Sequence, residues 1–73
     1  MPTQQLRAIW HPARARILEL LMRGPATRSQ MIKAAGGSLA KISYHSRVLC
    51  RAGCIQLAAS SDPSSDDPVY EIV

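Results

Sequence analysis

The 73-residue sequence predicts an α+β fold in which four short helices precede a two-stranded β-hairpin. Two features lead to this prediction. Apolar residues from Leu6 to Leu21, and again from Ile42 to Leu49, recur at the spacings of three and four that helices with one buried face show. Two short apolar runs follow at about residues 55–59 and 69–73, separated by a loop rich in Ser, Asp and Pro.

The first two helices are predicted at about residues 3–10 and 12–23. His11-Pro12 separates them, because proline lacks an amide donor and disfavours helix at the residue before it. We therefore expect Pro12 to begin the second helix, with His11 at its start. Gly24-Pro25 should end this helix.

The third helix should run from about residue 28 to Ala35. Thr27 and Gln30 have the spacing of a capping box, in which each side chain bonds to the other residue's backbone. The residues that we expect this helix to bury are Met31, Ala34 and Ala35. Gly36-Gly37 then forms the tight turn of a helix-turn-helix.

A fourth helix, over about residues 39–52 and capped by Ser38, is expected to have two different faces. The inner face carries Ile42, Ser46 and Leu49, with His45 beside them as a structural histidine. The outer face carries Ala40, Tyr44, Arg47 and Arg51. Gly53 can take the left-handed conformation that ends a helix, after which the first strand of the hairpin begins.

Charge is divided sharply along the chain. Residues 1–59 hold all nine Lys and Arg against Glu19 alone, a net charge of +8, whereas residues 60–73 hold four acidic residues and no basic one. A basic surface attracts polyanions such as nucleic acids. The basic part is therefore a candidate surface for binding a nucleic acid, and no membrane partner is expected because the chain has no long apolar run.

The remaining chemistry of the chain argues against an enzyme or a metal site. The sequence shows no nucleophile–base pair, no carboxylate pair in a cleft and no phosphate-binding glycine loop, so neither catalysis nor a cofactor is predicted. Cys50, Cys54 and His45 could supply metal ligands, but Gly53 breaks the helix between the cysteines and no fourth ligand is evident. Two cysteines without a signal peptide favour the reducing cytoplasm.

Two motifs resemble the winged helix-turn-helix regulators of the ArsR family. From His11 to Leu21, a proline and an arginine precede an Ile-Leu-x-x-Leu pattern, as at the start of the family's second helix. Ile42-Ser43-Tyr44-His45, then Arg47-Val48-Leu49, then Ala52-Gly53, resembles the family's recognition-helix signature. The resemblance runs from about Leu6 to Ile72 and implies one DNA-binding domain over residues 1–73, with its wing loop at 60–68.

The sequence departs from the family pattern in four respects. Ser46 stands where the family usually has leucine, and the wing carries Asp62, Asp66 and Asp67 where relatives often place arginine. The sequence ends at Val73, without the C-terminal helix that helps many relatives to dimerise. The third helix lacks the Cys-x-Cys pair of the family's metal sensors.

The resemblance implies a sequence-specific transcriptional regulator that places helix 39–52 in the major groove. Arg47, Tyr44 and Ser43 would read base edges, and basic residues around them, including Lys33, would contact phosphates. The predicted DNA-binding residues are Arg28, Ser38, Lys41, Ser43, Tyr44, Arg47 and Arg51. A homodimer through Leu6 and Trp10 is expected, because so small and aliphatic a core gains from covering an aromatic side chain.

An alternative function is a winged-helix module that binds a protein partner through its acidic wing or through the surface around Trp10. The acidic wing favours this alternative, because three aspartates in a solvated loop would be repelled by DNA. The basic fourth helix favours DNA binding.

Overall fold

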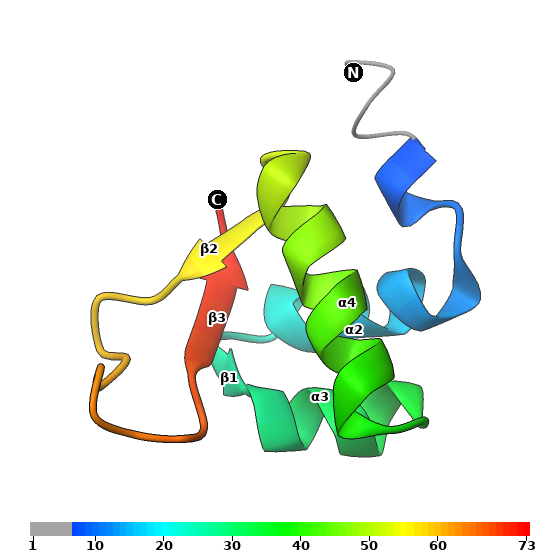
Figure 1. The fold of residues 1–73 in the computed structure, drawn as a ribbon. Coiled ribbons are helices and arrows are strands. Elements are labelled where there is room, and N and C mark those ends of the chain that lie inside the picture. The colour runs from blue at the N-terminus through cyan, green and yellow to red at the C-terminus, as the bar shows by residue number, and fades with distance from the viewer. Residues whose placement is uncertain (1–6) are drawn as a thin grey trace.

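The structure is a computed structural model that describes residues 7–73. Its regular elements are α2 (Pro12–Met22), β1 (Ala26–Thr27), α3 (Arg28–Ala35), α4 (Leu39–Arg51), β2 (Ile55–Leu57) and β3 (Val69–Ile72). Residues 7–9 are also helical and represent the end of the predicted first helix, the rest of which lies outside the described residues. The predicted α+β fold is confirmed: the helices pack together and a small antiparallel sheet lies at their side (Figure 1).

The helices begin at the residues that the sequence indicates. His11 is the N-cap of α2, where its Nδ1 accepts a hydrogen bond from the Ala13 amide at 3.1 Å, and Pro12 is the first helical residue. The capping box of α3 is complete, since Gln30 N donates to Thr27 Oγ1 at 3.2 Å and Thr27 N donates to Gln30 Oε1 at 2.8 Å. These local bonds satisfy amides that the helix itself leaves without acceptors.

The prediction that α3 buries Ala34 is wrong, although Met31 and Ala35 are buried as predicted. Met31 and Ala35 stand one helical turn apart and face the core, whereas Ala34 lies on the adjoining, exposed side. There it lines a shallow hollow with Arg16 and Glu19 of α2.

The sheet has three strands in the order β1-β3-β2, one more than the predicted hairpin. β1 pairs with β3 through Ala26 opposite Tyr70 and Thr27 opposite Val69, and β2 pairs with the other edge of β3. Both hairpin strands are slightly shorter than predicted. Because α3 starts directly after β1, this pairing holds the N-terminus of α3 at the base of the wing.

The core is aliphatic and is shared by all helices and the sheet. Its buried apolar residues are Ala8, Ile17, Leu21, Ala26, Met31, Ala35, Ile42, Leu49 and Ile55. The inner face of α4 is buried as predicted, and Ser46 within it is satisfied by its own helix, since its hydroxyl donates to the Ile42 carbonyl at 2.8 Å. A serine can therefore replace the family's usual leucine there without leaving a buried polar group unpaired.

Arg14 joins three helical segments through one side chain. Its Nε donates to His45 Nδ1 of α4 at 3.1 Å, and its Nη1 donates to the Ala8 carbonyl at 3.4 Å. Because His45 Nδ1 accepts a hydrogen bond, the imidazole is neutral and carries its proton on Nε2. The structural role predicted for His45 is thus confirmed.

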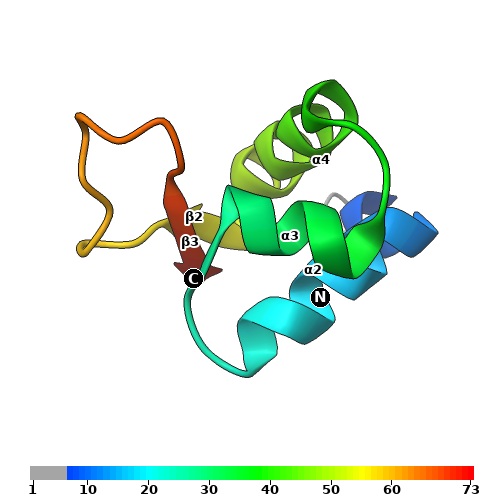
Figure 2. The ribbon, with the colours of Figure 1, turned by 90° about the horizontal axis from the view of Figure 1, so that it is seen from below.

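Figure 2 shows α4 and the loop between β2 and β3 projecting on the same side of the molecule, with α2 on the other side. The wing is therefore placed to share one surface with the outer face of α4. Among the described residues, no helix has the length and apolarity needed to cross a membrane.

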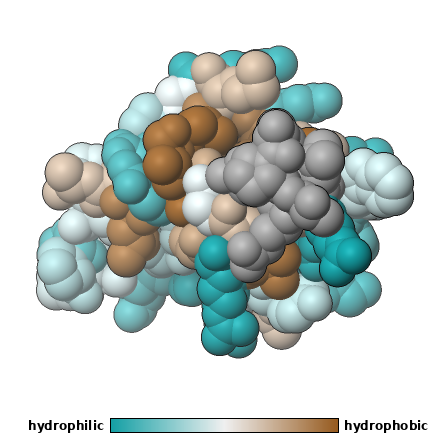
Figure 3. Space-filling view, turned by 90° about the horizontal axis from the view of Figure 1, so that it is seen from above, coloured by the Kyte–Doolittle hydropathy of each residue, from teal (hydrophilic) through white to brown (hydrophobic). Residues whose placement is uncertain are grey.

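Several apolar side chains remain at the surface, near the end of α4 and the C-terminus (Figure 3). Trp10 is 84% exposed, and Met22 and Val73 are also largely exposed. Met22 and Val73 line a hollow of about 350 Å³ together with Ile9. We call Ile9, Met22 and Val73 the apolar end patch; Trp10 follows Ile9 directly in the chain.

The stability of the fold should decrease at mildly acidic pH because of His45. Burial, followed by electrostatic interaction with His11, Arg14 and Lys41, lowers the pKa of His45 below its ordinary value of 6.5. The unfolded chain then binds more protons than the folded chain, so the free energy of unfolding should fall as the pH drops below 6.5 towards the folded pKa. Above 6.5 this contribution to stability is fully present.

Urea denaturation of the wild type and of His45→Gln at about pH 7.5 and about pH 5.5 measures this effect, because glutamine can accept the Arg14 bond but does not titrate in this range. We expect the wild type to lose more stability on acidification than the variant. Equal losses would show that His45 is not responsible.

Two leucines of α4 provide a matched test of which face of the helix packs against the core. Leu49 is fully buried and Leu39 is 53% exposed. We expect Leu49→Ala to lower the free energy of unfolding by roughly 2–5 kcal/mol, because it leaves a cavity in the core. Leu39→Ala should change it by less than about 0.5 kcal/mol. Similar losses in both variants, measured by chemical denaturation, would contradict the described orientation of α4.

Candidate nucleic-acid interface

The outer face of α4 is exposed and basic. Lys41, Tyr44, Arg47 and Arg51 all lie at the surface, and no acidic residue occurs in the helix. The outer face predicted from the helical period is therefore confirmed, since Ala40, Tyr44, Arg47 and Arg51 are all exposed. Ser43, by contrast, is half-buried and lies at the edge of this face.

Both ends of α4 are fixed by hydrogen bonds. Ser38 is the N-cap, and its Oγ accepts from the Lys41 amide at 3.2 Å. At the other end Gly53 has φ +77°, its amide donates to the Cys50 carbonyl, and the Cys54 amide donates to the Leu49 carbonyl at 2.9 Å. This is the Schellman arrangement, which ends the helix and directs the chain into β2.

The Tyr44 ring contacts Arg14 of α2 and its chain neighbour His45. The Arg14 guanidinium carbon lies 5.8 Å from the centre of the Tyr44 ring, and the His45 ring lies 5.4 Å from it. A cation over an aromatic face is attracted by the ring quadrupole. Sequence reasoning did not find Arg14, because it lies 31 positions from His45 and no periodicity connects them.

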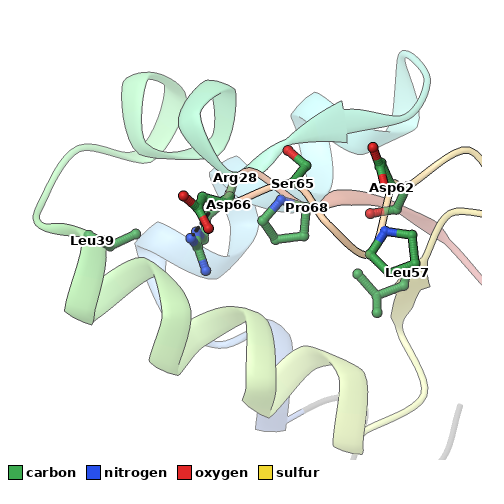
Figure 4. A pocket seen from close by; sticks show the side chains of 9 residues that line it. Arg28, Leu39, Leu57, Asp62, Ser65, Asp66 and Pro68 are labelled. Carbon is green, nitrogen blue, oxygen red and sulfur yellow. Dashed lines mark hydrogen bonds between the residues drawn. The ribbon is translucent and has the colours of Figure 1, made fainter.

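Arg28 lies where α3, α4 and the wing meet. It is half-buried, its amide donates to the Pro68 carbonyl at 2.9 Å, and its Nη2 donates to the Asp66 carbonyl at 2.7 Å. Together with Leu39 of α4 these residues line an open hollow of about 530 Å³ (Figure 4). The guanidinium has five N–H donors, so further donors remain for a ligand.

The three aspartates of the wing have different surroundings. Asp67 is half-buried and its Oδ1 accepts from the Ser29 amide at 2.9 Å, so the expectation that it is merely solvated is wrong. Asp62 accepts from the amide and hydroxyl of Ser64 within the loop. Hydrogen bonds, first of all from the Ser29 and Ser64 amides, lower the pKa values of Asp67 and Asp62 respectively. The Asp66 side chain is exposed.

The cysteines and histidines do not form a recognisable metal centre in the part of the chain that the structure describes. Within residues 7–73, no three His, Cys, Asp or Glu side chains are grouped as metal ligands. Cys50 and Cys54 are free thiols, and burial raises the pKa of each, which makes the reactive thiolate less available.

Comparison with known proteins identifies the family. Residues 11–56, more than half of the chain, match the bacterial regulatory proteins of the arsR family. Among solved structures, an ArsR family transcriptional regulator is 26% identical with a TM-score of 0.81, over 96% of this chain and 72% of that one. A protein from M. tuberculosis is 27% identical with a TM-score of 0.78, over 94% of this chain and 66% of that one.

A third structure, from Mycobacterium bovis, is a homodimeric winged helix-turn-helix DNA-binding domain. It is 22% identical with a TM-score of 0.77, over 94% of this chain and 60% of that one, and so supports the fold. The chain thus spans roughly two thirds of the length of these structures. A comparison with curated proteins finds no match.

These comparisons do not favour the alternative of a protein-interaction module, since the related structures are of transcriptional regulators. The chain belongs to the ArsR family of bacterial regulatory proteins and is a winged helix-turn-helix transcriptional regulator that binds DNA, rather than an enzyme.

Proposed function

We propose that the chain binds double-stranded DNA sequence-specifically by placing α4 in the major groove, and that residues 1–73 act as one domain for this purpose. The observation that carries the proposal is the contrast between the two faces of α4. One face is buried through Ile42 and Leu49, and the other presents basic side chains with no carboxylate. A helix of this kind fits the width of the major groove of B-DNA.

Within this arrangement, Arg47 and Tyr44 are the residues best placed to contact bases. Both are exposed on the outer face of α4, with Ser43 at its edge. An arginine can donate two parallel hydrogen bonds to O6 and N7 of guanine, whereas hydroxyl groups contact several bases. Arg47 is therefore the proposed main determinant of sequence preference.

Phosphate contacts are proposed for four residues around the base-reading part of α4, namely Arg28, Ser38, Lys41 and Arg51. Lys41 and Arg51 lie one near each end of the exposed face, and Arg28 lies at the wing side. The Ser38 hydroxyl accepts a hydrogen bond as the N-cap and can still donate one to a phosphate oxygen. These contacts add affinity and fix the register without reading sequence.

A homodimer through the apolar end patch is proposed as the DNA-binding form. The exposure of Trp10, which follows Ile9 of this patch in the chain, supports it, as does the description of the M. bovis domain as homodimeric. Leu6, the other predicted interface residue, lies outside the described residues. Two copies would contact half-sites about one helical turn apart. The cytoplasm, where bacterial DNA lies, is the proposed location.

Replacing Arg47 tests the proposed base contact. We expect Arg47→Ala to weaken binding to the preferred site by about 1–3 kcal/mol and to relax base preference at one position. The preferred site is first selected from random duplex DNA, and affinities are then measured by fluorescence anisotropy. Arg23→Ala is the control, because Arg23 is an equally charged, exposed residue at the end of α2. Equal losses on preferred and random DNA would assign Arg47 to phosphate contact.

Replacing Trp10 tests the proposed dimer. Trp10→Ala removes the most exposed large apolar side chain of the described residues and should weaken self-association. Sedimentation equilibrium of the wild type and the variant, free and with a palindromic duplex, measures this. A wild type that stays monomeric in both conditions would reject the dimer, and an unchanged variant would reject the role of Trp10.

A further inference from the structure

We propose that Asp67 is a positioning residue for DNA binding, which caps α3 and thereby holds the Asp66 carbonyl where it fixes the Arg28 guanidinium. This inference rests on the proposed function, in which Arg28 contacts a DNA phosphate. It assigns an acidic wing residue a favourable role in binding a polyanion.

The first three amides of α3 are all satisfied, and the wing supplies two of the acceptors. The Arg28 amide donates to the Pro68 carbonyl and the Ser29 amide to the Asp67 carboxylate, while only the Gln30 amide uses the N-cap Thr27. Helix amides at this end otherwise need water or a ligand. The wing and α3 are therefore joined as one unit.

The position of the Asp66 carbonyl follows from these bonds. Asp66 immediately precedes Asp67 and Pro68. The Asp67 carboxylate and the Pro68 carbonyl both accept hydrogen bonds from amides of α3. The Asp66 carbonyl then meets Arg28 Nη2 at 2.7 Å, and Figure 4 shows both residues beside the hollow that α4 and the wing enclose. Fixing one N–H in advance reduces the entropy that a long arginine side chain loses on binding a phosphate.

The charge of Asp67 is also partly balanced where it lies. It faces the positive end of the α3 dipole, and Arg28 is close enough to help lower its pKa. The exposed carboxylate of Asp66 has no hydrogen-bond or ion-pair partner among residues 7–73. Asp66 should therefore repel DNA more than Asp67 does, although the two are neighbours.

Three single variants distinguish the effect of the hydrogen bond between Asp67 and Ser29 from the effect of the negative charge of Asp67. Asp66→Ala removes one charge and keeps the carbonyl, so it should tighten binding at low salt. Asp67→Asn also removes one charge but keeps an oxygen that can accept from Ser29, so it should tighten binding similarly. Asp67→Ala removes charge and cap together, and we expect it to weaken binding by about threefold to tenfold, the range for a residue that acts through another.

The same measurements in the Arg28→Ala background test whether Asp67 influences DNA binding through Arg28. If Asp67 acts through Arg28, Asp67→Ala should no longer weaken binding there. In the wild-type background, Asp67→Ala should reduce the slope of log affinity against log salt concentration by about 1, because one phosphate contact is lost. We expect the same reduction for Arg28→Ala. Loss of the cap lowers the stability of α3, so binding is measured at a temperature at which circular dichroism shows every variant folded.

The outcomes distinguish this inference from the proposed function beneath it. Tighter binding by Asp67→Ala, matching Asp66→Ala, would show that Asp67 acts only as a charge and would overturn the inference. An equal weakening with and without Arg28 would overturn it as well. A wild type with no salt-dependent binding to duplex DNA would instead overturn the proposed function, and the inference with it.

Discussion

The anchoring of α4 by one face is the constraint on which the rest of the structure depends. Ile42 and Leu49 are fully buried in a small aliphatic core, and the bond from Arg14 to His45 adds a polar attachment beside them. Because these contacts fix the rotation of the helix about its axis, Tyr44 and Arg47 have to face outward. The proposed DNA-binding surface is thus a consequence of how the core is filled.

The wing follows from a second, smaller constraint. A strand of two residues, Ala26–Thr27, pairs with β3 and brings the start of α3 to the base of the wing. The wing then supplies acceptors for the amides of α3, so its carboxylates do not all point into solvent. This explains how an acidic wing can coexist with DNA binding: part of its charge serves to hold the structure.

Much of the fold could be predicted from the sequence, because the signals are local. Pro12, the Thr27–Gln30 capping box and Ser38 each act within four residues, and each is confirmed at a helix start. What could not be predicted depends on contacts between distant residues. β1 is too short to show an alternating pattern, and the bond from Ser29 to Asp67 spans 38 positions. The outward side chains of α4 were predictable from its period, but their contacts with DNA remain proposals.

Backbone amide chemical shifts of isotope-labelled protein, followed during titration with a selected duplex, test most directly whether the outer face of α4 meets DNA. We predict that the largest shifts occur within residues 38–51 and at Arg28 and Ser29, and that high salt reverses them, since phosphate contacts depend on salt. Shifts confined to α2 and the apolar end patch, with α4 unchanged, would contradict the proposed mode of binding.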